Sequence, residues 1–348
     1  MTVLSSLYGR ATALRRSWYA GDRSRSRRLQ QPVISVGNLS LGGSGKTPVV
    51  ATLARMLVAA GERPSILSRG YRRPDATRGV VIVSDGQTVL ATAAQSGDEP
   101  LMLARTVAGA AVVVSANRLE AGTLAETRLG CTVHILDDGF QHVQLARDVN
   151  LLVGSRRDLD DRVVPSGTLR EPLTAAGAAD AVLVEGSDED LQAVKFGFGV
   201  STAFRVTRRF HPARAIDGDA VPRQRVIAVA GIARPERFFA ALRDQGWDIA
   251  REIVFRDHHW FSAKDVQTIE QAARDAGVDV VITTEKDAAR LEDLIPNVGR
   301  ALSGSPRGPD KVRATQITTW AVLPVEASVD DRFAPWLAGR LAAARRHG

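Results

Sequence analysis

A glycine-rich segment between an apolar strand and a helix constrains this chain more than any other feature. Residues 33–47 read V-I-S-V-G-N-L-S-L-G-G-S-G-K-T, with four β-favouring residues before the turn and a helical pattern directly after it. The glycines would let backbone N–H groups approach phosphate oxygens without a Cβ clash, and the helix N-terminus adds unpaired donors. This order of strand, loop and helix predicts a nucleotide-binding P-loop.

The P-loop predicts a role for each of its residues. Lys46 would reach the β- and γ-phosphates, and the Thr47 hydroxyl would ligate magnesium. Ser40 stands at the first position of the pattern G-x-x-x-x-G-K-[ST], where glycine is usual. The alternative is a chance Gly-Lys-Thr in an ordinary turn, which the flanking strand and helix disfavour. The predicted nucleotide-binding residues are Ser40, Leu41, Gly42, Gly43, Ser44, Gly45, Lys46 and Thr47.

Apolar strands alternate with helical segments along most of the chain. These strands lack polar alternation, as expected where both faces of a sheet are buried. The sequence therefore predicts an α/β fold: a P-loop NTPase-like, mostly parallel sheet flanked by helices, with a second, smaller α/β portion. The expected strands are 33–36, 66–67, 80–84, 111–114, 132–136, 149–153, 181–184, 226–230, 252–255, 278–283 and 315–325.

The length of 348 residues suits about two domains. The charged and glycine-rich stretch 185–200 predicts a boundary, and 303–310 an exposed loop. The expected parts are a basic segment at 1–30, a P-loop core at 31–184, a boundary region at 185–225, and a C-terminal α/β portion at 226–348 that completes the active site.

The basic charge of the chain is concentrated at its amino terminus. Residues 1–30 hold seven arginines and one acid, a balance of +6 within a total of +7. Leu4, Leu7, Tyr8, Ala11, Leu14 and Trp18 recur there at helical spacing, and no apolar run approaches the ~20 residues that span a bilayer. A basic amphipathic helix of this kind suits an anionic membrane surface. Docking on its own domain is the second alternative, and nucleic acid a distant third.

The single cysteine, Cys131, excludes a disulfide framework and fits a reducing compartment. In an apolar neighbourhood it is expected to pack in the core. His134, which lies within an expected strand, is likewise expected to be a core histidine with satisfied hydrogen bonds.

Two adjacent acids, Asp137 and Asp138, follow the apolar strand 133–136. P-loop enzymes hold magnesium with a carboxylate at such a strand end, where open sheets also bind ligands. We therefore predict Thr47, Asp137 and Asp138 as the magnesium site, with an ordinary Asx turn as the alternative.

Asp98, in Gly-Asp-Glu-Pro, is a candidate general base, because phosphoryl transfer to an alcohol needs a carboxylate near the hydroxyl proton. A helix N-cap is the alternative. His258 and His259 follow Asp257 after a strand and before Ser262, which can cap the next helix; a polar loop is an equally good interpretation. The segment 284–287, T-E-K-D, is either part of the site or a solvated helix start.

The sequence Asn-Lys-x-Asp is absent, which disfavours a guanine-reading GTPase and leaves ATP as the expected nucleotide. An ordered set of motifs then resembles the tetraacyldisaccharide 4′-kinase family and extends from about residue 33 to 325. The motifs are G-N-L through G-K-T-P at 37–48, S-R-G-Y at 68–71, G-D-E-P at 97–100, D-D-G-F-Q-H at 137–142, L-R-E-P at 169–172, A-G-I-A-R-P at 230–235, F-R-D-H at 255–258 and T-E-K-D at 284–287.

The resemblance implies a bacterial lipid A enzyme on the cytoplasmic face of the inner membrane, bound peripherally. Such enzymes move the γ-phosphoryl of ATP to the 4′-hydroxyl of a tetraacylated glucosamine disaccharide 1-phosphate. The expected cofactor is Mg²⁺, and nucleic acid is not expected as a partner. Asp98 would be the base and His258 its partner. Thr168 departs from the pattern, because the family usually has proline there. The resemblance implies an acceptor site formed by Arg69, Gln141, His142, Arg170 and Glu171.

A rival hypothesis comes from another functional class: a membrane-tethered P-loop ATPase that switches a protein partner. A kinase consumes ATP slowly until a lipid disaccharide is supplied. A switch responds to a protein or to bare membrane, and releases only inorganic phosphate.

Overall fold

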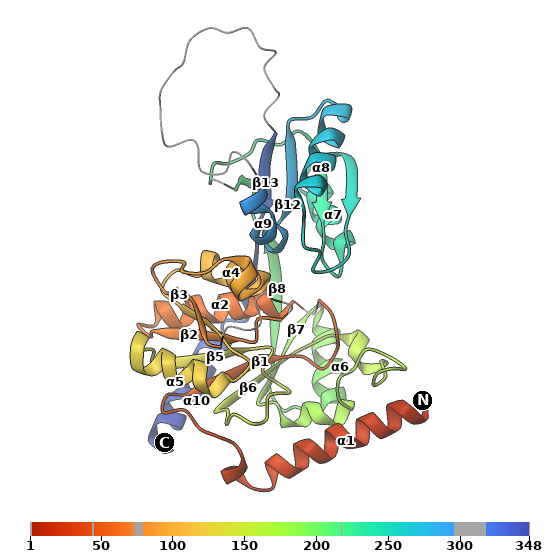
Figure 1. Cartoon of the computed structure of the whole chain (residues 1–348). Helices are drawn as coiled ribbons and strands as arrows, with labels where there is room; N and C mark the ends of the chain where they lie inside the picture. Colours follow the sequence, from red (N-terminus) through yellow and green to blue (C-terminus); the bar gives the residue numbers. More distant parts are fainter. Residues whose placement is uncertain are drawn as a thin grey trace. The chain divides into compact units, whose positions relative to one another are not determined.

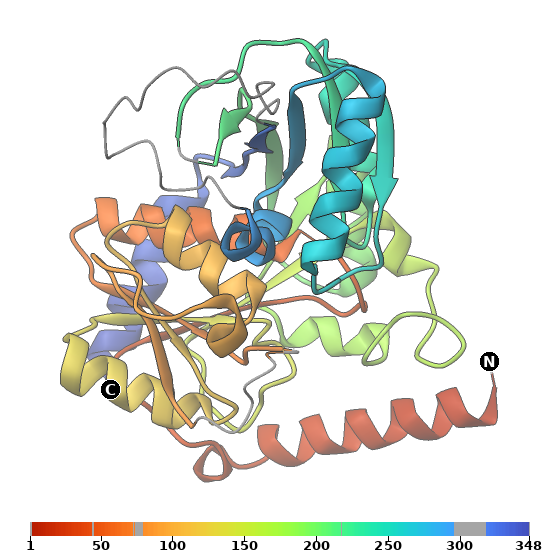
Figure 2. The same ribbon diagram turned by 45° about the horizontal axis from the view of Figure 1, so that its top comes forward.

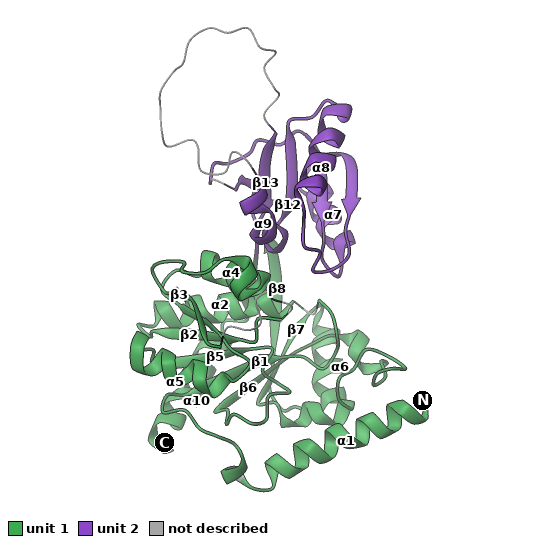
Figure 3. Cartoon of the chain, viewed as in Figure 1, with its two compact units in different colours: residues 1–209, 326–348 green, residues 210–325 purple. Residues whose placement is uncertain are grey.

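The computed structural model describes residues 2–43, 45–71, 73, 79–216, 218–295 and 318–347. The chain divides into two compact units, coloured separately in Figure 3. Unit 1 contains residues 1–209 and 326–348, and unit 2 contains residues 210–325. Residues 303–310, expected to be an exposed loop, lie outside the described part of the chain.

Unit 1 is built on a sheet in which nine described strands follow the order β14-β8-β7-β6-β1-β5-β2-β4-β3 (Figure 1). The pairs from β4 to β8 are parallel, whereas β3 runs antiparallel to β4. The strands are β1 (Val33–Gly37), β2 (Pro64–Ser68), β3 (Val81–Asp85), β4 (Ala111–Val114), β5 (Val133–Asp137), β6 (Val149–Gly154), β7 (Ala181–Glu185), β8 (Ala203–Phe210) and β14 (Val325–Val329).

Helices of unit 1 pack on this sheet: α2 on β1, β2 and β5, α5 on β2 and β4, and α6 on β7. Strands β1, β2, β4 and β5 are buried along their whole length, so the uninterrupted apolar runs of the sequence match their position between helices. The helices are α1 (Val3–Ala20), α2 (Lys46–Ala59), α3 (Ala93–Ser96), α4 (Asp98–Thr106), α5 (Arg118–Leu129), α6 (Asp188–Phe198) and α10 (Phe333–His347), with short 3₁₀ turns η1 (Arg23–Arg25), η2 (Arg156–Leu159) and η3 (Leu173–Ala178).

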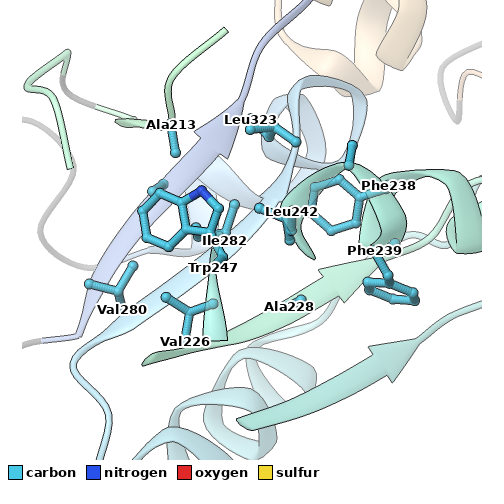
Figure 4. Packing of buried hydrophobic residues seen from close by; sticks show 13 residues of the cluster. Ala213, Val226, Ala228, Phe238, Phe239, Leu242, Trp247, Val280, Ile282 and Leu323 are labelled. Carbon is cyan, nitrogen blue, oxygen red and sulfur yellow. The ribbon is translucent and has the colours of Figure 1, made fainter. Parts of the chain in front are cut away.

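Unit 2 has its own sheet, with described strands in the order β11-β10-β12-β13-β9, and its own core. Trp247, Phe238 and Phe239 pack against the apolar residues of β10 and β12 (Figure 4). The elements are β9 (Arg214–Ala215), β10 (Arg225–Ala230), α7 (Pro235–Asp244), β11 (Asp248–Val254), α8 (Ala263–Ala276), β12 (Val280–Thr284), α9 (Glu285–Leu291), η4 (Glu292–Leu294) and β13 (Thr319–Leu323). The predicted α/β class with a smaller second portion is confirmed.

The stretch 185–200 is not a domain boundary, because it contains α6, which packs on β7 inside unit 1. Ser187 caps the helix by accepting a hydrogen bond from the Asp190 amide, and three acids occupy its first turn. Leu191, Val194 and Phe198 join the core. The charges that suggested a linker therefore belong to a helix N-terminus, where they interact favourably with the dipole.

The chain enters unit 2 at residue 210 and returns to unit 1 at residue 326, so the predicted C-terminal portion 226–348 is divided between the units. Residues 315–317 of the expected strand 315–325 lie outside the described residues, and the described part is divided at Pro324 between β13 and β14. Proline has no N–H and cannot continue a ladder. After it, β14 lies next to β8, and α10 packs Phe333, Leu337 and Leu341 into the protein.

Helix α1, at the amino terminus, runs as a separate rod along one side of unit 1 in Figure 1 and Figure 2. One side of it docks: Ser5 Oγ lies 2.7 Å from Ser166 Oγ, and Gly9 faces Pro172 and Val163. The opposite side exposes Leu4, Leu7, Leu14 and other large apolar residues. The helix thus both docks on its own unit and leaves an apolar face uncovered. Within the described residues, no helix is long and apolar enough to cross a membrane.

Candidate active site

The glycine-rich loop connects β1 to α2, as predicted. Gly45 adopts a left-handed conformation with φ of 79° and caps α2, which begins at Lys46. A side chain at this position would be strained by the backbone conformation. Gly42 also has positive φ, 93°, and among the described residues none comes within 4 Å of the position where its Cβ would be. Ser44 lies outside the described residues.

Lys46 is held by two groups that flank the loop. Its Nζ donates to Asn38 Oδ1 at 2.6 Å and lies 3.2 Å from Asp138 Oδ1. Asn38 in turn donates through Nδ2 to the Ser40 carbonyl at 2.6 Å. Sequence reasoning identified the lysine and missed Asn38, although it lies within the same glycine-rich segment.

The segment 168–170 supports the loop from the side. The Leu41 amide donates to the Thr168 carbonyl at 2.8 Å, and the Arg170 amide donates to the Leu39 carbonyl at 2.7 Å. Thr168, the departure from the family pattern, uses the N–H that proline would lack: it donates to Asp161 Oδ1 at 3.1 Å. The substitution therefore leaves the loop's backbone anchored and adds a side-chain partner.

A further arginine, absent from the predicted site, lies against the P-loop. A Cβ built on Gly45 would come within 1.9 Å of Arg208 Nη2, so the guanidinium packs directly on the glycine. Arg208 projects from β8 and pairs with Glu185, at the end of β7, at 2.9 Å. Because it comes 162 residues after Lys46 in the chain, no local pattern could have identified it.

Asp137 and Asp138 occupy the carboxyl end of β5 in different environments. Asp137 is buried and accepts a hydrogen bond from Ser68 Oγ at 3.3 Å. Burial raises its pKa, and the neighbouring charges of Glu99 and Asp138 raise it further. For Asp138, burial is outweighed by Lys46 and Arg170, which hold its pKa below the ordinary value. Asp138 adopts a left-handed backbone conformation, with φ of 53°.

The donor set fits magnesium bound together with a nucleotide. Within the described residues, no three His, Cys, Asp or Glu side chains converge to form a metal cage. Magnesium usually takes one or two carboxylates, and phosphate oxygens and water complete its shell. A buried carboxylate such as Asp137, whose pKa is raised by burial and by nearby acids, is a group that a cation would stabilise as the anion.

Asp98 is the first residue of α4 and is 4% exposed. The N-cap is Gly97, with φ of 91°, so Asp98 itself is not the cap. Its Oδ1 accepts from the Glu99 amide at 2.9 Å. Glu99, which raises the pKa of Asp137, is a further acid of this neighbourhood that sequence reasoning did not single out.

Positive side chains gather around His142. Burial, together with the charges of Arg118, Arg147, Arg15 and Arg69, lowers the pKa of His142 to about 4. Burial and Arg69 also lower the pKa of Arg118 to about 10. The Nε atom of Arg118 is buried and makes no hydrogen bond within the described part of the chain. Such a group of cations suits an anionic ligand.

Arg170, Gln141 and Glu171 lie near the P-loop but have different partners. Arg170 Nη1 donates to Asp138 Oδ2 at 2.7 Å, and Gln141 Nε2 donates to the Asn38 carbonyl at 3.0 Å. Glu171 instead pairs with Arg16 of α1, whose Nε donates to Glu171 Oε2 at 2.8 Å. Arg16 also lies over the Phe140 ring, 4.3 Å from its centroid. Within the predicted acceptor site, Arg170 and Gln141 thus bond to residues around the P-loop, whereas Glu171 bonds to α1.

His258 belongs to unit 2 and follows β11 in a turn. It has φ of 59°, and its amide donates to the Gly231 carbonyl at 3.2 Å. His259 stacks on Phe255 and lies 3.2 Å from Asp265. The pairing of Asp98 with His258 joins residues of different units and remains a prediction.

Three expectations about single residues are confirmed. His134 is fully buried, with Nδ1 at 2.7 Å from Ser65 Oγ and Nε2 at 3.1 Å from Glu126. Cys131 packs in the core, and burial raises its pKa to about 11. Ser262 caps α8, as its position before the helix indicated.

Comparisons with known proteins identify the family of this chain. Residues 1–342 match the model of the family described as tetraacyldisaccharide-1-P 4′-kinase. The tetraacyldisaccharide 4′-kinases of Geobacter sulfurreducens and Geobacter metallireducens are each 42% identical, over 90% and 86% of this chain and 91% and 90% of their own lengths. The crystal structure of LpxK from Aquifex aeolicus in complex with ATP is 30% identical, covers 97% of each chain and superposes with a TM-score of 0.76. This chain, with its P-loop and paired aspartates at the end of β5, therefore belongs to the tetraacyldisaccharide-1-P 4′-kinase family.

Proposed function

We propose that this chain transfers the γ-phosphoryl group of ATP to the 4′-hydroxyl of a tetraacylated glucosamine disaccharide 1-phosphate. The observation that carries the proposal is the placement of Lys46 between Asn38 and Asp138 at the start of α2, in a chain that belongs to this kinase family. Family membership does not favour the rival, an ATPase that switches a protein partner.

The nucleotide would bind on the loop from Ser40 to Thr47, with Lys46 and Arg208 as the cations nearest its phosphates. Thr47 and the carboxylates of Asp137 and Asp138 would hold magnesium, which neutralises phosphate charge when bound. Arg170 keeps Asp138 ionised and in place. Asp98 would accept the proton of the attacking hydroxyl, with His258 as its partner.

The acceptor carries a phosphate at position 1 that needs cationic partners. Arg69, Arg118 and Arg15 supply charge around His142, and burial keeps His142 itself neutral near pH 7 because its pKa is lowered to about 4. Gln141, Arg170 and Glu171 would order the adjacent segment through Asn38, Asp138 and Arg16.

Helix α1 would lie on the cytoplasmic face of the inner membrane. Its exposed Leu4, Leu7 and Leu14 share one side, whereas Ser5, Gly9 and Arg16 dock on the other. Such a helix inserts its apolar face into the headgroup region while arginines attract anionic lipid.

The chemical step is tested with ATP labelled at the γ-phosphate, the tetraacyl disaccharide 1-phosphate and Mg²⁺, with products separated by thin-layer chromatography. A labelled lipid that requires both the disaccharide and Mg²⁺ is expected. Release of inorganic phosphate alone, stimulated by vesicles without disaccharide, would support the switch instead.

Membrane binding is tested with the triple variant Leu4→Ser, Leu7→Ser and Leu14→Ser, which leaves the docked side of α1 intact. It should sediment less with phosphatidylglycerol vesicles than the parent protein. Phe196→Ser is the matched control, because Phe196 is 90% exposed on α6. Equal sedimentation of all three proteins would contradict a membrane role for α1.

A further inference from the structure

The segment Thr284–Asp287, which connects β12 to α9, has no role in the reaction as proposed above. In unit 2, however, it contacts the turn that carries His258. Lys286 Nζ lies 3.2 Å from His258 Nε2 and 3.5 Å from Asp257 Oδ1. Asp257 Oδ2 lies 3.8 Å from the same His258 nitrogen, which is beyond hydrogen-bond distance, so Lys286 is the closer of these two neighbours of Nε2. The Lys286 and His258 side chains are only 18% and 15% exposed, so this contact is largely shielded from water.

We infer that Lys286 is a positioning residue that fixes the tautomer of His258, with the proton on Nδ1. An ammonium group has three donors and no acceptor, so the nitrogen that it contacts must present its lone pair. The Asp257 carboxylate beside Nζ favours the charged form of the lysine. In a neutral imidazole, the hydrogen bond made by one nitrogen decides which nitrogen carries the proton.

The next residue, Asp287, holds the backbone on which this contact depends. Asp287 Oδ2 accepts from the Gly231 amide at 3.0 Å and from Thr284 Oγ1 at 2.7 Å, and Asp287 pairs with Arg290. A Cβ on Gly231 would approach Asp287 Oδ1 to 3.0 Å, so any side chain at this position would push the Asp287 carboxylate away from its hydrogen-bond partners.

Arg290 completes the support from the other side. It donates to the Gly231 carbonyl at 3.1 Å and to the His259 carbonyl at 2.9 Å. His258 donates its amide to Gly231 and is followed by His259, and Arg290 holds the carbonyls of both of these residues. The left-handed backbone conformation of His258 persists only because such contacts enforce it. The segment therefore fixes the backbone of His258 through Asp287, and its ring through Lys286.

The catalytic consequence rests on the proposed function, in which His258 partners the base Asp98. With Nε2 occupied by Lys286, Nδ1–H is the donor that would orient a carboxylate. A histidine in the other tautomer would present a lone pair there, and a carboxylate cannot donate to it when ionised.

The tautomer is measured directly in the full-length protein by long-range ¹H–¹⁵N correlation of histidine rings at pH 8. His258→Gln identifies the His258 signals among those of six histidines. We expect an Nδ1–H tautomer in the parent protein and in Lys286→Arg, since guanidinium is also a pure donor. Lys286→Met should shift the population toward Nε2–H, whereas Lys264→Met, which removes an exposed lysine of the same unit, should not. A parent protein with the proton on Nε2, or an unchanged Lys286→Met spectrum, overturns the inference.

Turnover separates this inference from the proposed function. Lys286→Met should lower kcat roughly 100-fold, the low end of what general acid–base catalysis contributes, with little change in KM for ATP and with recovery in Lys286→Arg. If Lys286→Met changes the tautomer but not kcat, the inference stands and the dyad of Asp98 and His258 fails. Amide hydrogen exchange of residues 225–231 verifies that unit 2 stays folded in each variant.

Discussion

Two groups of buried charge lie at strand ends in this molecule, one in each unit, and they are balanced differently. At the end of β5, Asp137 has a raised pKa because of burial and neighbouring acids, while arginines crowd around His142. In unit 2, Asp287 is also buried and its pKa is raised by burial, but it pairs with Arg290 and accepts from Gly231 and Thr284.

This difference in charge balance separates a ligand-binding group from a structural one. Charges of like sign held together destabilise the folded protein until a ligand of opposite charge arrives, so the group in unit 1 has the properties of a binding site. A buried pair with every oxygen hydrogen-bonded is rigid and needs no ligand, so the group in unit 2 has the properties of a support. Substitutions in the first should change activity more than stability, and substitutions in the second the reverse.

The largest expected effect is loss of turnover in Lys46→Ala. Removing a cation from a site where phosphoryl charge develops costs roughly 10³-fold in kcat. The kinase assay measures the loss, and thermal unfolding should change little. Lys195→Ala, on α6, is the control and should behave like the parent protein. Near-normal turnover in Lys46→Ala would remove the loop from the nucleotide site.

Asp287→Ala should mainly destabilise unit 2. Leaving Arg290 buried without its partner is expected to cost about 3–5 kcal/mol. Hydrogen exchange of peptides from β10 and β12 measures the free energy of opening. Asp275→Ala, an exposed acid on α8, should change it by less than about 0.5 kcal/mol. If both variants exchange alike, the pair is not a support.

Arg208→Ala should weaken ATP binding about 10-fold, which is about 1.4 kcal/mol. The guanidinium packs on Gly45, where the phosphates are expected. Arg209→Ala is a close control, because neighbouring residues of a strand point to opposite faces and Arg209 is exposed. Equal nucleotide affinities in the two variants would limit Arg208 to its ion pair with Glu185.

The smallest effect distinguishes the two aspartates by sign. At pH 8 Asp137→Asn should stabilise the protein by on the order of 1 kcal/mol, because a carboxyl whose folded pKa is raised loses stability as pH rises through that pKa. The gain should vanish toward pH 3, below the ordinary aspartate pKa of ~3.9, where the unfolded group is also largely protonated. Asp138→Asn should instead destabilise at pH 8, since its folded pKa is lowered. Urea unfolding at both pH values measures this, and equal signs would contradict the assignment.

Local patterns predicted the parts of the fold that depend on neighbours in sequence. The strand before Gly37, the helix after Gly45 and the acids at the end of β5 all lie where the sequence indicated. Parallel strands buried on both faces are apolar throughout, which makes them recognisable without any partner.

What sequence reasoning missed depends on distant partners. Arg208 reaches the P-loop only because β8 lies in the same sheet. From the sequence alone, Asp287 could equally have belonged to a solvated helix start. In the folded unit it is buried by contacts with Gly231 and Arg290, which are distant from it or invisible to a local pattern. The acids at the start of α6 look like part of a linker when they are read alone. The apolar residues that follow them recur at helical spacing, and this spacing is the signal that indicates a helix.

The double connection of unit 2, through β8 and β14, has a consequence for synthesis on the ribosome. Unit 2 is inserted into unit 1, so the residues that complete the sheet of unit 1 are made after those of unit 2. Domains usually fold as they emerge, from the amino terminus onward. Here unit 2 can finish while unit 1 still lacks β14 and α10. Until β14 pairs with β8, the nascent chain holds an uncovered β8 edge, to which a strand of another chain could add.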